Sequence, residues 1–255
     1  MKPRVDDTFD SDGVPIHYQV FGEGEPLVLV HGFASSIRGN WANSGWIETL
    51  APLRQVVALD CRGHGESGKP HDVESYSRGA MMDDVVRLMD HLKIEKADLF
   101  GYSMGAGISL RLLIGHESRF RSVVLGGIGN AIATSTRGRE GLGSAMLAET
   151  AEEVTDPVGK AFRAFAEANG NDLKALAACQ GAFRESFDVG RLGEVSIPVL
   201  VVVGEADVLA PDPQLLAEAI AGARLGTIPG RDHLTVVPDD RFKEAVVGFL
   251  GEATI

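Results

Sequence analysis

The sequence predicts an α/β fold in which helices cover both faces of a mostly parallel central sheet. Short apolar runs with the length of strands buried on both faces recur along the chain. Longer segments whose apolar residues repeat at helical spacing lie between them, and this alternation is typical of a parallel sheet. The chain has 255 residues, of which 44% are hydrophobic and 24% charged, enough for one large domain with a substantial core.

The strands are expected where apolar residues cluster between turn signals. Ile16–Phe21 alternates in character after the turn at Asp12-Gly13, which predicts a strand of a hairpin. A last run, Arg224–Ile228, is interrupted by Gly226. The other expected strands are Leu27–Val30, Val56–Leu59, Ala97–Phe100, Ser122–Leu125 and Val199–Val203.

Helices are expected between these runs. Arg78–Leu92 places its apolar residues along one broad face and pairs Asp83 with Arg87 four residues on. The other predicted helices are Met104–Ile114, Pro213–Ile220 and Phe242–Leu250.

Residues 130–192 contain no strand-like run but only helical patches, around Phe162 and Phe165 and around Leu173 and Leu176. This segment is expected to be a helical insertion between two strands, and residues 1–129 together with 193–255 are expected to form the core.

Charge and composition exclude several classes of protein. Twenty-four basic against 36 acidic residues give a net charge of −12, which argues against a nucleic acid or an anionic membrane as partner. No apolar stretch is long enough to span a bilayer, and the first residues show no secretory signal, so a cytoplasmic location is expected. Cys61 and Cys179 lie outside any metal-binding or disulfide pattern. The oligomeric state stays open.

The most informative motif is Gly101-Tyr102-Ser103-Met104-Gly105, which matches G-x-S-x-G. It directly follows one predicted strand and directly precedes a predicted helix, the context in which this motif exposes a serine on a sharp turn. Ser103 is therefore the candidate nucleophile.

A serine hydroxyl needs a base, and the base needs an acid that orients it. His233 follows the last predicted strand, and Asp207 follows the penultimate one, so both belong to the same edge of the sheet. The order Ser103, Asp207, His233 is the nucleophile–acid–base order expected after such a motif. Glu205 and Asp212 are alternative acids, and His64 and His71 are rival bases; the remaining histidines, taken as structural or exposed, are His17, His31, His91 and His116.

Negative charge that develops on a substrate oxygen needs backbone N–H donors. The amide of Met104, directly after the nucleophile, is one candidate. The second candidate is the amide of Phe33 in His31-Gly32-Phe33, which directly follows the strand Leu27–Val30.

These segments resemble the α/β-hydrolase superfamily, and in particular its small esterase-like members, over nearly the whole chain. The stretch Asp60–Ser67 resembles the family's D-x-R-G-x-G-x-S loop, which is mainly architectural. The resemblance implies that residues 130–192 form a helical cap over the active site. The serine at position 103 argues against the relatives that use an aspartate there to open epoxides or displace halide. The HGGG-type donor of some lipases is absent.

The expected activity is hydrolysis of carboxylic esters with short to medium acyl chains, polyesters included, through an acyl-enzyme. The expected partner is a small ester, and no metal or organic cofactor is required. A carbon–carbon bond hydrolase, a lactonase or a thioesterase could use the same triad, and a non-catalytic small-ligand receptor could use the same fold. Four phenylalanines either line an acyl pocket or hold the cap on the core: Phe162, Phe165, Phe183 and Phe187.

Overall fold

The computed structural model describes residues 1–76, 79–130, 140–182 and 189–253. Its centre is an eight-stranded sheet in the order β1-β2-β4-β3-β5-β6-β7-β8. β1 and β2 form an antiparallel hairpin, β2 is also antiparallel to β4, and all other pairs are parallel. The strands are β1 (Val5–Ser11), β2 (Val14–Phe21), β3 (Pro26–Val30), β4 (Gln55–Leu59), β5 (Ala97–Tyr102), β6 (Phe120–Gly126), β7 (Val199–Gly204) and β8 (Arg224–Ile228).

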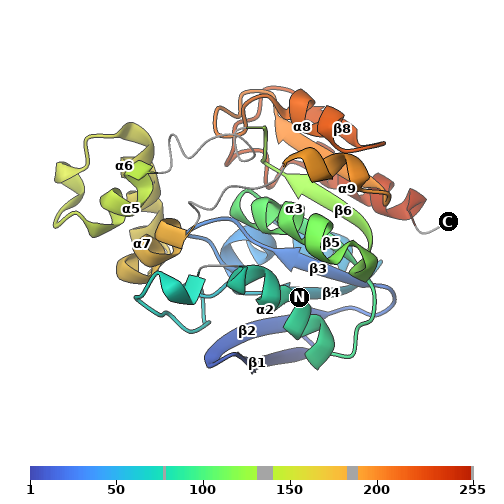
Figure 1. Cartoon of the computed structure of the whole chain (residues 1–255), viewed down its shortest axis with the longest axis horizontal. Helices are drawn as coiled ribbons and strands as arrows, with labels where there is room; N and C mark the ends of the chain where they lie inside the picture. The colour runs from blue at the N-terminus through green and yellow to red at the C-terminus, as the bar shows by residue number, and fades with distance from the viewer. Residues whose placement is uncertain (77–78, 131–139, 183–188, 254–255) are drawn as a thin grey trace.

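Helices cover both faces of the sheet (Figure 1). The helices α2 (Ala80–His91), α3 (Met104–His116) and α8 (Pro213–Ala219) bury apolar side chains in one cluster, and α1 (Trp46–Leu50) and α9 (Asp240–Glu252) bury theirs in another. The central strands divide between these clusters residue by residue. In β3, Val28 and Val30 join the first cluster, whereas Leu27 and Leu29 join the second. This alternation is what burial of a strand on both faces requires.

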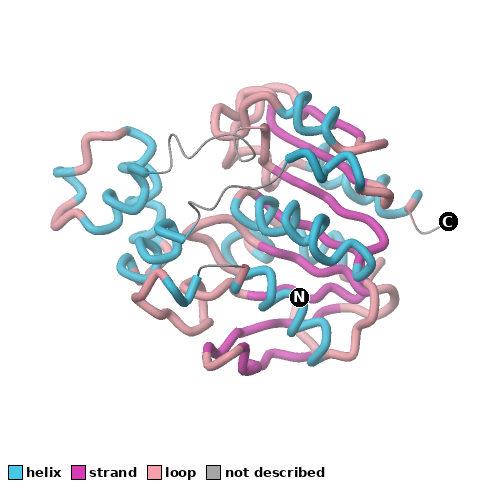
Figure 2. The backbone as a smooth tube through the Cα atoms, viewed as in Figure 1, coloured by secondary structure: helices cyan, strands magenta, loops and turns pink. Residues whose placement is uncertain are grey.

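Between β6 and β7 the described chain is helical and contains no strand. The helices α5 (Glu140–Leu147), α6 (Pro157–Ala168) and α7 (Leu173–Ala182) gather at one end of the sheet (Figures 1 and 2). Arg163 joins α6 to the end of α5, because its guanidinium donates to the carbonyls of Ala145 and Ala148 at 2.8 and 2.9 Å. Short 3-10 or π turns complete the fold: η1 (Ile37–Ala42), η2 (Glu74–Tyr76), η3 (Glu117–Arg119), η4 (Ala151–Glu153) and η5 (Val189–Glu194).

The predicted fold class is confirmed, and so is each predicted strand and helix of the core within a few residues. The first strand, Val5–Ser11, was missed because most of its side chains are exposed and several are acidic, so it has no apolar period. The predicted helix at Arg78 begins at Ala80, and Arg78 itself lies outside the described residues. Among the described helices, none is both long enough and apolar enough to cross a membrane.

Candidate active site

Ser103 lies on the turn between β5 and α3, with φ 53° and ψ −108°, a backbone conformation that L-residues rarely adopt. Its amide donates to the carbonyl of Gly126 at 2.8 Å, which ties the turn to the neighbouring strand β6. Helix α3 starts immediately and packs closely on β3. A Cβ at Gly105 would lie 2.0 Å from the carbonyl oxygen of Val30, so only glycine permits this approach. The turn therefore places the serine hydroxyl at the carboxyl ends of the parallel strands.

The structure brings Ser103, His233 and Asp207 together. The distance from Ser103 Oγ to His233 Nε2 is 2.9 Å, and the distance from His233 Nδ1 to Asp207 Oδ2 is 2.8 Å. Both His233 and Asp207 are 8% exposed. A carboxylate accepts only, so Nδ1 carries the ring proton and Nε2 is left to accept the serine proton. The second oxygen of Asp207 accepts from the amide of Leu209 at 3.0 Å, which fixes the carboxylate.

The rival acids and bases lie in other environments. Glu205 accepts from the amide of Gly230, and Asp212 immediately precedes α8. His64 is fully buried, and this burial lowers its pKa to about 3, so it stays neutral. His71 is exposed and pairs with Asp172.

The candidate oxyanion donors belong to segments that meet at Ser103. A Cβ at Gly32 would lie 3.4 Å from the Cβ of Ser103, so the loop that carries the Phe33 amide contacts the nucleophile. Among the residues that the structure describes, neither the Phe33 nor the Met104 amide has a hydrogen-bond partner. Met104 also opens the 13-residue helix α3, whose N-terminus favours negative charge. His31 is structural: its Nε2 accepts from the amide of Cys61 at 2.9 Å.

Tyr102, the variable residue before the nucleophile, positions the segment that carries the base. Its hydroxyl donates to the carbonyl oxygen of His233, and the two rings lie 5.3 Å apart. Burial raises the pKa of Tyr102 well above its ordinary value, so the phenol keeps the proton that it donates. The motif gave no signal for this role, because its second position admits any residue.

The loop Asp60–Ser67 has the architectural contacts expected of it. Asp60 Oδ1 accepts from the amide of Ile37 at 2.7 Å, and Oδ2 contacts Nδ1 of His17 at 2.9 Å. Arg62 forms a buried bidentate pair with Asp84 at 2.7 and 2.6 Å. These bonds tie the loop after β4 to neighbouring segments, and none of them involves the nucleophile.

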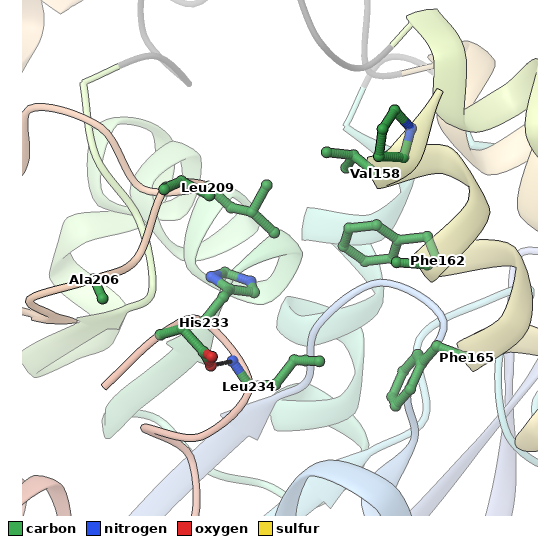
Figure 3. A pocket seen from close by; sticks show the side chains of 11 residues that line it. Val158, Phe162, Phe165, Ala206, Leu209, His233 and Leu234 are labelled. Atoms are coloured by element: carbon green, nitrogen blue, oxygen red, sulfur yellow. Dashed lines mark hydrogen bonds between the residues drawn. The ribbon is translucent and has the colours of Figure 1, made fainter. Parts of the chain in front are cut away.

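Two cavities flank the serine and the histidine. An apolar cavity of about 300 Å³ lies between α6 and the loops that carry Asp207 and His233 (Figure 3). A more polar cavity of about 280 Å³ adjoins it and is lined by Ser103, Gly32 and Phe33. Both share Phe162, Phe165, His233 and Leu234. The apolar cavity adds Pro157, Val158, Ala161, Ala206, Val208, Leu209 and Asp232, and the polar one adds Ser35, Gly39, Asn40, Asn43, Ser44, Tyr102, Val237 and Pro238.

Phe162 and Phe165 therefore face the site. The ring of Phe162 also packs near that of Phe33, with 5.9 Å between the ring centroids. Phe183 and Phe187, for which the same two roles are open, lie outside the described residues. In the described part of the chain, no group of three or more His, Cys, Asp or Glu side chains is placed to hold a metal ion.

Several known proteins with similar sequences or structures are hydrolases, and others are named as peroxidases or acetyltransferase components. The sequence profile of the alpha/beta hydrolase fold matches residues 25–141. The chain is 38% identical over 128 residues to a 2-hydroxymuconate semialdehyde hydrolase of Pseudomonas sp. (strain CF600), a match that spans 49% of this chain and 44% of that protein's length. It is 29% identical over 261 residues, 94% of each chain, to 3-oxoadipate enol-lactonase 2 of Acinetobacter baylyi. Among solved structures, the enol-lactonase from Burkholderia xenovorans superposes with a TM-score of 0.75 at 26% identity, over 96% of this chain and 99% of that one.

Proposed function

Because the chain belongs to the α/β-hydrolase superfamily, we propose that it hydrolyses uncharged carboxylic esters through an acyl-enzyme on Ser103. A lactone is a cyclic ester and falls within this proposal. The observation that carries it is the unbroken chain of hydrogen bonds from Ser103 through His233 to Asp207, with distances of 2.9 and 2.8 Å. A receptor that only binds its ligand has no need of this chain.

The mechanism follows from the atoms in contact. Ser103 Oγ attacks the ester carbonyl carbon while His233 Nε2 takes the hydroxyl proton, and Asp207 stabilises the resulting imidazolium. The amides of Phe33 and Met104 donate to the carbonyl oxygen as it becomes an oxyanion. His233 then protonates the leaving alcohol as the C–O bond breaks. Water repeats the sequence on the acyl-enzyme and releases the acid. No step requires a metal or an organic cofactor.

The cavities support an uncharged substrate. Neither is lined by a lysine or arginine among the described residues. The described lining therefore favours a neutral substrate, since an unpaired buried charge is costly. Small neutral esters suit cavities of about 300 and 280 Å³, whereas the thiol ester of a large charged carrier does not.

We also propose that residues 130–192 act as a cap on a core of residues 1–129 and 193–255. In support, α6 supplies Phe162 and Phe165 to both cavities and Pro157 and Val158 to the apolar one. Substrate selectivity would then depend on this insertion.

The second candidate function is hydrolysis of a carbon–carbon bond with the same triad. The similarity to 2-hydroxymuconate semialdehyde hydrolase supports it. The two activities separate on paired substrates: turnover of a vinylogous 1,5-diketone without turnover of p-nitrophenyl esters would favour carbon–carbon cleavage.

The decisive test is a fluorophosphonate probe followed by esterase assays. Wild type should be labelled on Ser103 and should turn over p-nitrophenyl esters. Ser103→Ala should lose both, and Asp207→Asn should lower kcat by about 10⁴ because the imidazole loses its fixed tautomer. Ser144→Ala, which changes an exposed serine of α5, is the matched control and should behave as wild type. Esterase activity retained by Ser103→Ala, or an unlabelled folded wild type, would overturn the proposal.

A further inference from the structure

The residue after Phe33 holds a strained backbone conformation. Ala34 is fully buried and has a φ of 58°, in the left-handed region that residues with a side chain rarely adopt. It is the third residue of a four-residue turn, which is closed by a bond of 3.2 Å from the amide of Ser35 to the carbonyl of Gly32. A turn with a positive φ at this place favours glycine. An alanine stays in this conformation only where neighbouring groups hold it.

The helical insertion supplies a hydrogen bond to Ala34. Asn171, in the link between α6 and α7, donates from Nδ2 to the carbonyl oxygen of Ala34 at 2.8 Å. The direction of a carbonyl follows from the backbone angles of its own residue. A change of Ala34 to a right-handed conformation would therefore redirect the carbonyl and lose the bond. The bond from Asn171 thus stabilises the strained conformation relative to the ordinary one.

Asn171 is itself held in place on both sides. Its backbone amide donates to the carbonyl of Ala166 in α6 at 3.0 Å. The next residue, Asp172, accepts from the amide of Ala175 at the start of α7 at 3.0 Å, and its other oxygen pairs with His71 of the core at 2.9 Å. The carboxamide of Asn171 is therefore presented to the turn from a fixed segment of the insertion.

The peptide that carries the proposed oxyanion donor is held by the core as well. The carbonyl of Gly32 belongs to the same planar peptide as the N–H of Phe33. Because Nε2 of His31 accepts an amide proton, its Nδ1 carries the ring proton and donates to this carbonyl at 2.8 Å. From the insertion, Phe162 extends into the site beside the ring of Phe33 (Figure 3). The core thus holds the turn at Gly32, and the insertion holds it at Phe33 and Ala34.

We infer that Asn171 is a positioning residue, through which the helical insertion keeps the Phe33 amide in place for the developing oxyanion. Asn171 acts on the reaction through the backbone of the turn 32–35. A donor that is in place before charge develops needs no reorganisation, so loss of this bond slows the chemical step and leaves substrate binding unchanged. The inference rests on the proposed ester hydrolysis and makes the oxyanion site of that reaction depend on the insertion.

The test compares Asn171→Ala with Asn169→Ala. The side chain of Asn169 donates to the carbonyl of Phe165 at 2.7 Å, so both substitutions remove an amide donor from a carbonyl, and only the first removes it from the core turn. We would measure kcat and KM for p-nitrophenyl butanoate, together with the inhibition constant of butylboronic acid. Boron bonds to Ser103 Oγ while His233 takes the proton, and the resulting tetrahedral anion places a negative oxygen where the oxyanion forms.

Asn171→Ala should lower kcat about tenfold and raise the boronic acid inhibition constant about tenfold, with KM within about twofold of wild type. Acylation and deacylation both pass through an oxyanion, so kcat reports this loss whichever step is slower. Asn169→Ala should leave all three constants within about twofold of wild type. Asn171→Asp is a second variant of nearly the same shape that replaces the donor with an acceptor, and its losses should be at least as large.

Three results would overturn the inference. The first is a kcat and an inhibition constant that stay within about twofold of wild type in the folded Asn171 variants. The second is a raised KM with an unchanged kcat, because Asn171 would then only shape the substrate cavity. The third is a lower kcat without weaker boronic acid binding, or an equal loss in Asn169→Ala. A wild type without ester turnover or fluorophosphonate labelling would instead refute the proposed function.

Discussion

His17 on β2 makes the stability of this protein depend on pH. Its ring contacts Asp60 through Nδ1 at 2.9 Å and Asp6 through Nε2 at 2.8 Å. The hydrogen bond to Asp60 raises the pKa of His17, burial lowers it by less, and the bond to Asp6 raises it further. The pKa therefore moves from 6.5 to about 9. In the folded protein this histidine is a cation at pH 7.

A pKa raised by folding means that the folded state holds the proton more tightly than the unfolded state. The resulting stabilisation is complete below pH 6.5 and is lost as the pH rises through about 9. Each tenfold change in proton affinity is worth about 1.4 kcal/mol, so a rise from 6.5 to about 9 sets a ceiling near 3 kcal/mol. The Asp6 side chain is 55% exposed and is screened by solvent, so we expect about 1–2 kcal/mol.

The measurement is urea unfolding of wild type and His17→Gln at intervals from pH 6 to pH 10. Glutamine is neutral throughout, so subtracting its free energy of unfolding from that of wild type removes every other titrating group. The difference should be about 1–2 kcal/mol larger at pH 6, where His17 is charged, than at pH 10, where it is neutral. Asp6→Asn, which leaves Asp60 in place, should show a smaller pH dependence. A difference between wild type and His17→Gln that is the same at pH 6 and pH 10 would refute the reasoning.

Two further predictions concern packing and the thiols. Gly105→Ala should lower the free energy of unfolding by about 3 kcal/mol or more, because its Cβ would lie 2.0 Å from the Val30 carbonyl oxygen and force α3 away from β3. In the same helix, the Cβ of Gly115→Ala meets no atom within 4 Å, so this variant should raise the free energy of unfolding by about 0.5–1 kcal/mol. The same change in stability for both variants in thermal unfolding would contradict this account. Cys61 and Cys179 are buried, and burial raises the pKa of both thiols. A thiol reagent at pH 8 should therefore label them only after denaturation. Labelling of the folded protein at the rate of an exposed cysteine would contradict this prediction.

The central strands and the turn at Ser103 were predictable because their signals are local. An apolar run such as Val199–Gly204 is buried along its whole length, and its sequence alone shows this. The G-x-S-x-G turn places a strand, a serine and a helix within a few residues. The meeting of Asp207 and His233 was predictable for a related reason, since parallel strands bring the residues that follow them to one edge of the sheet.

Contacts that depend on side chains meeting across long distances in the sequence were not predictable. Tyr102 bonds to the carbonyl of His233, which is 131 residues away, and no periodicity marks either residue for that bond. Asn40 sits in a π-helical turn that has no sequence signature, and its bond with the amide of Gly32 is visible only once the atoms around it are placed. The two cavities arise between α6 and the core loops, so their polarity depends on which residues face each other there.

The loop that carries the Phe33 amide combines these long-range contacts at one point. Ala34 has a φ of 58°, an uncommon conformation for a residue with a side chain, and such strain persists only where the surroundings impose it. Side chains from separate segments hold the loop: Asn40 accepts from Gly32 at 2.9 Å, Asn171 donates to the Ala34 carbonyl at 2.8 Å, and Asp60 accepts from Ile37 at 2.7 Å. An oxyanion donor is effective when it is held in place before charge develops, since no reorganisation is then needed during the reaction. Because Asn171 belongs to the helical insertion, the insertion helps to hold the backbone next to the proposed oxyanion donor as well as lining the cavities.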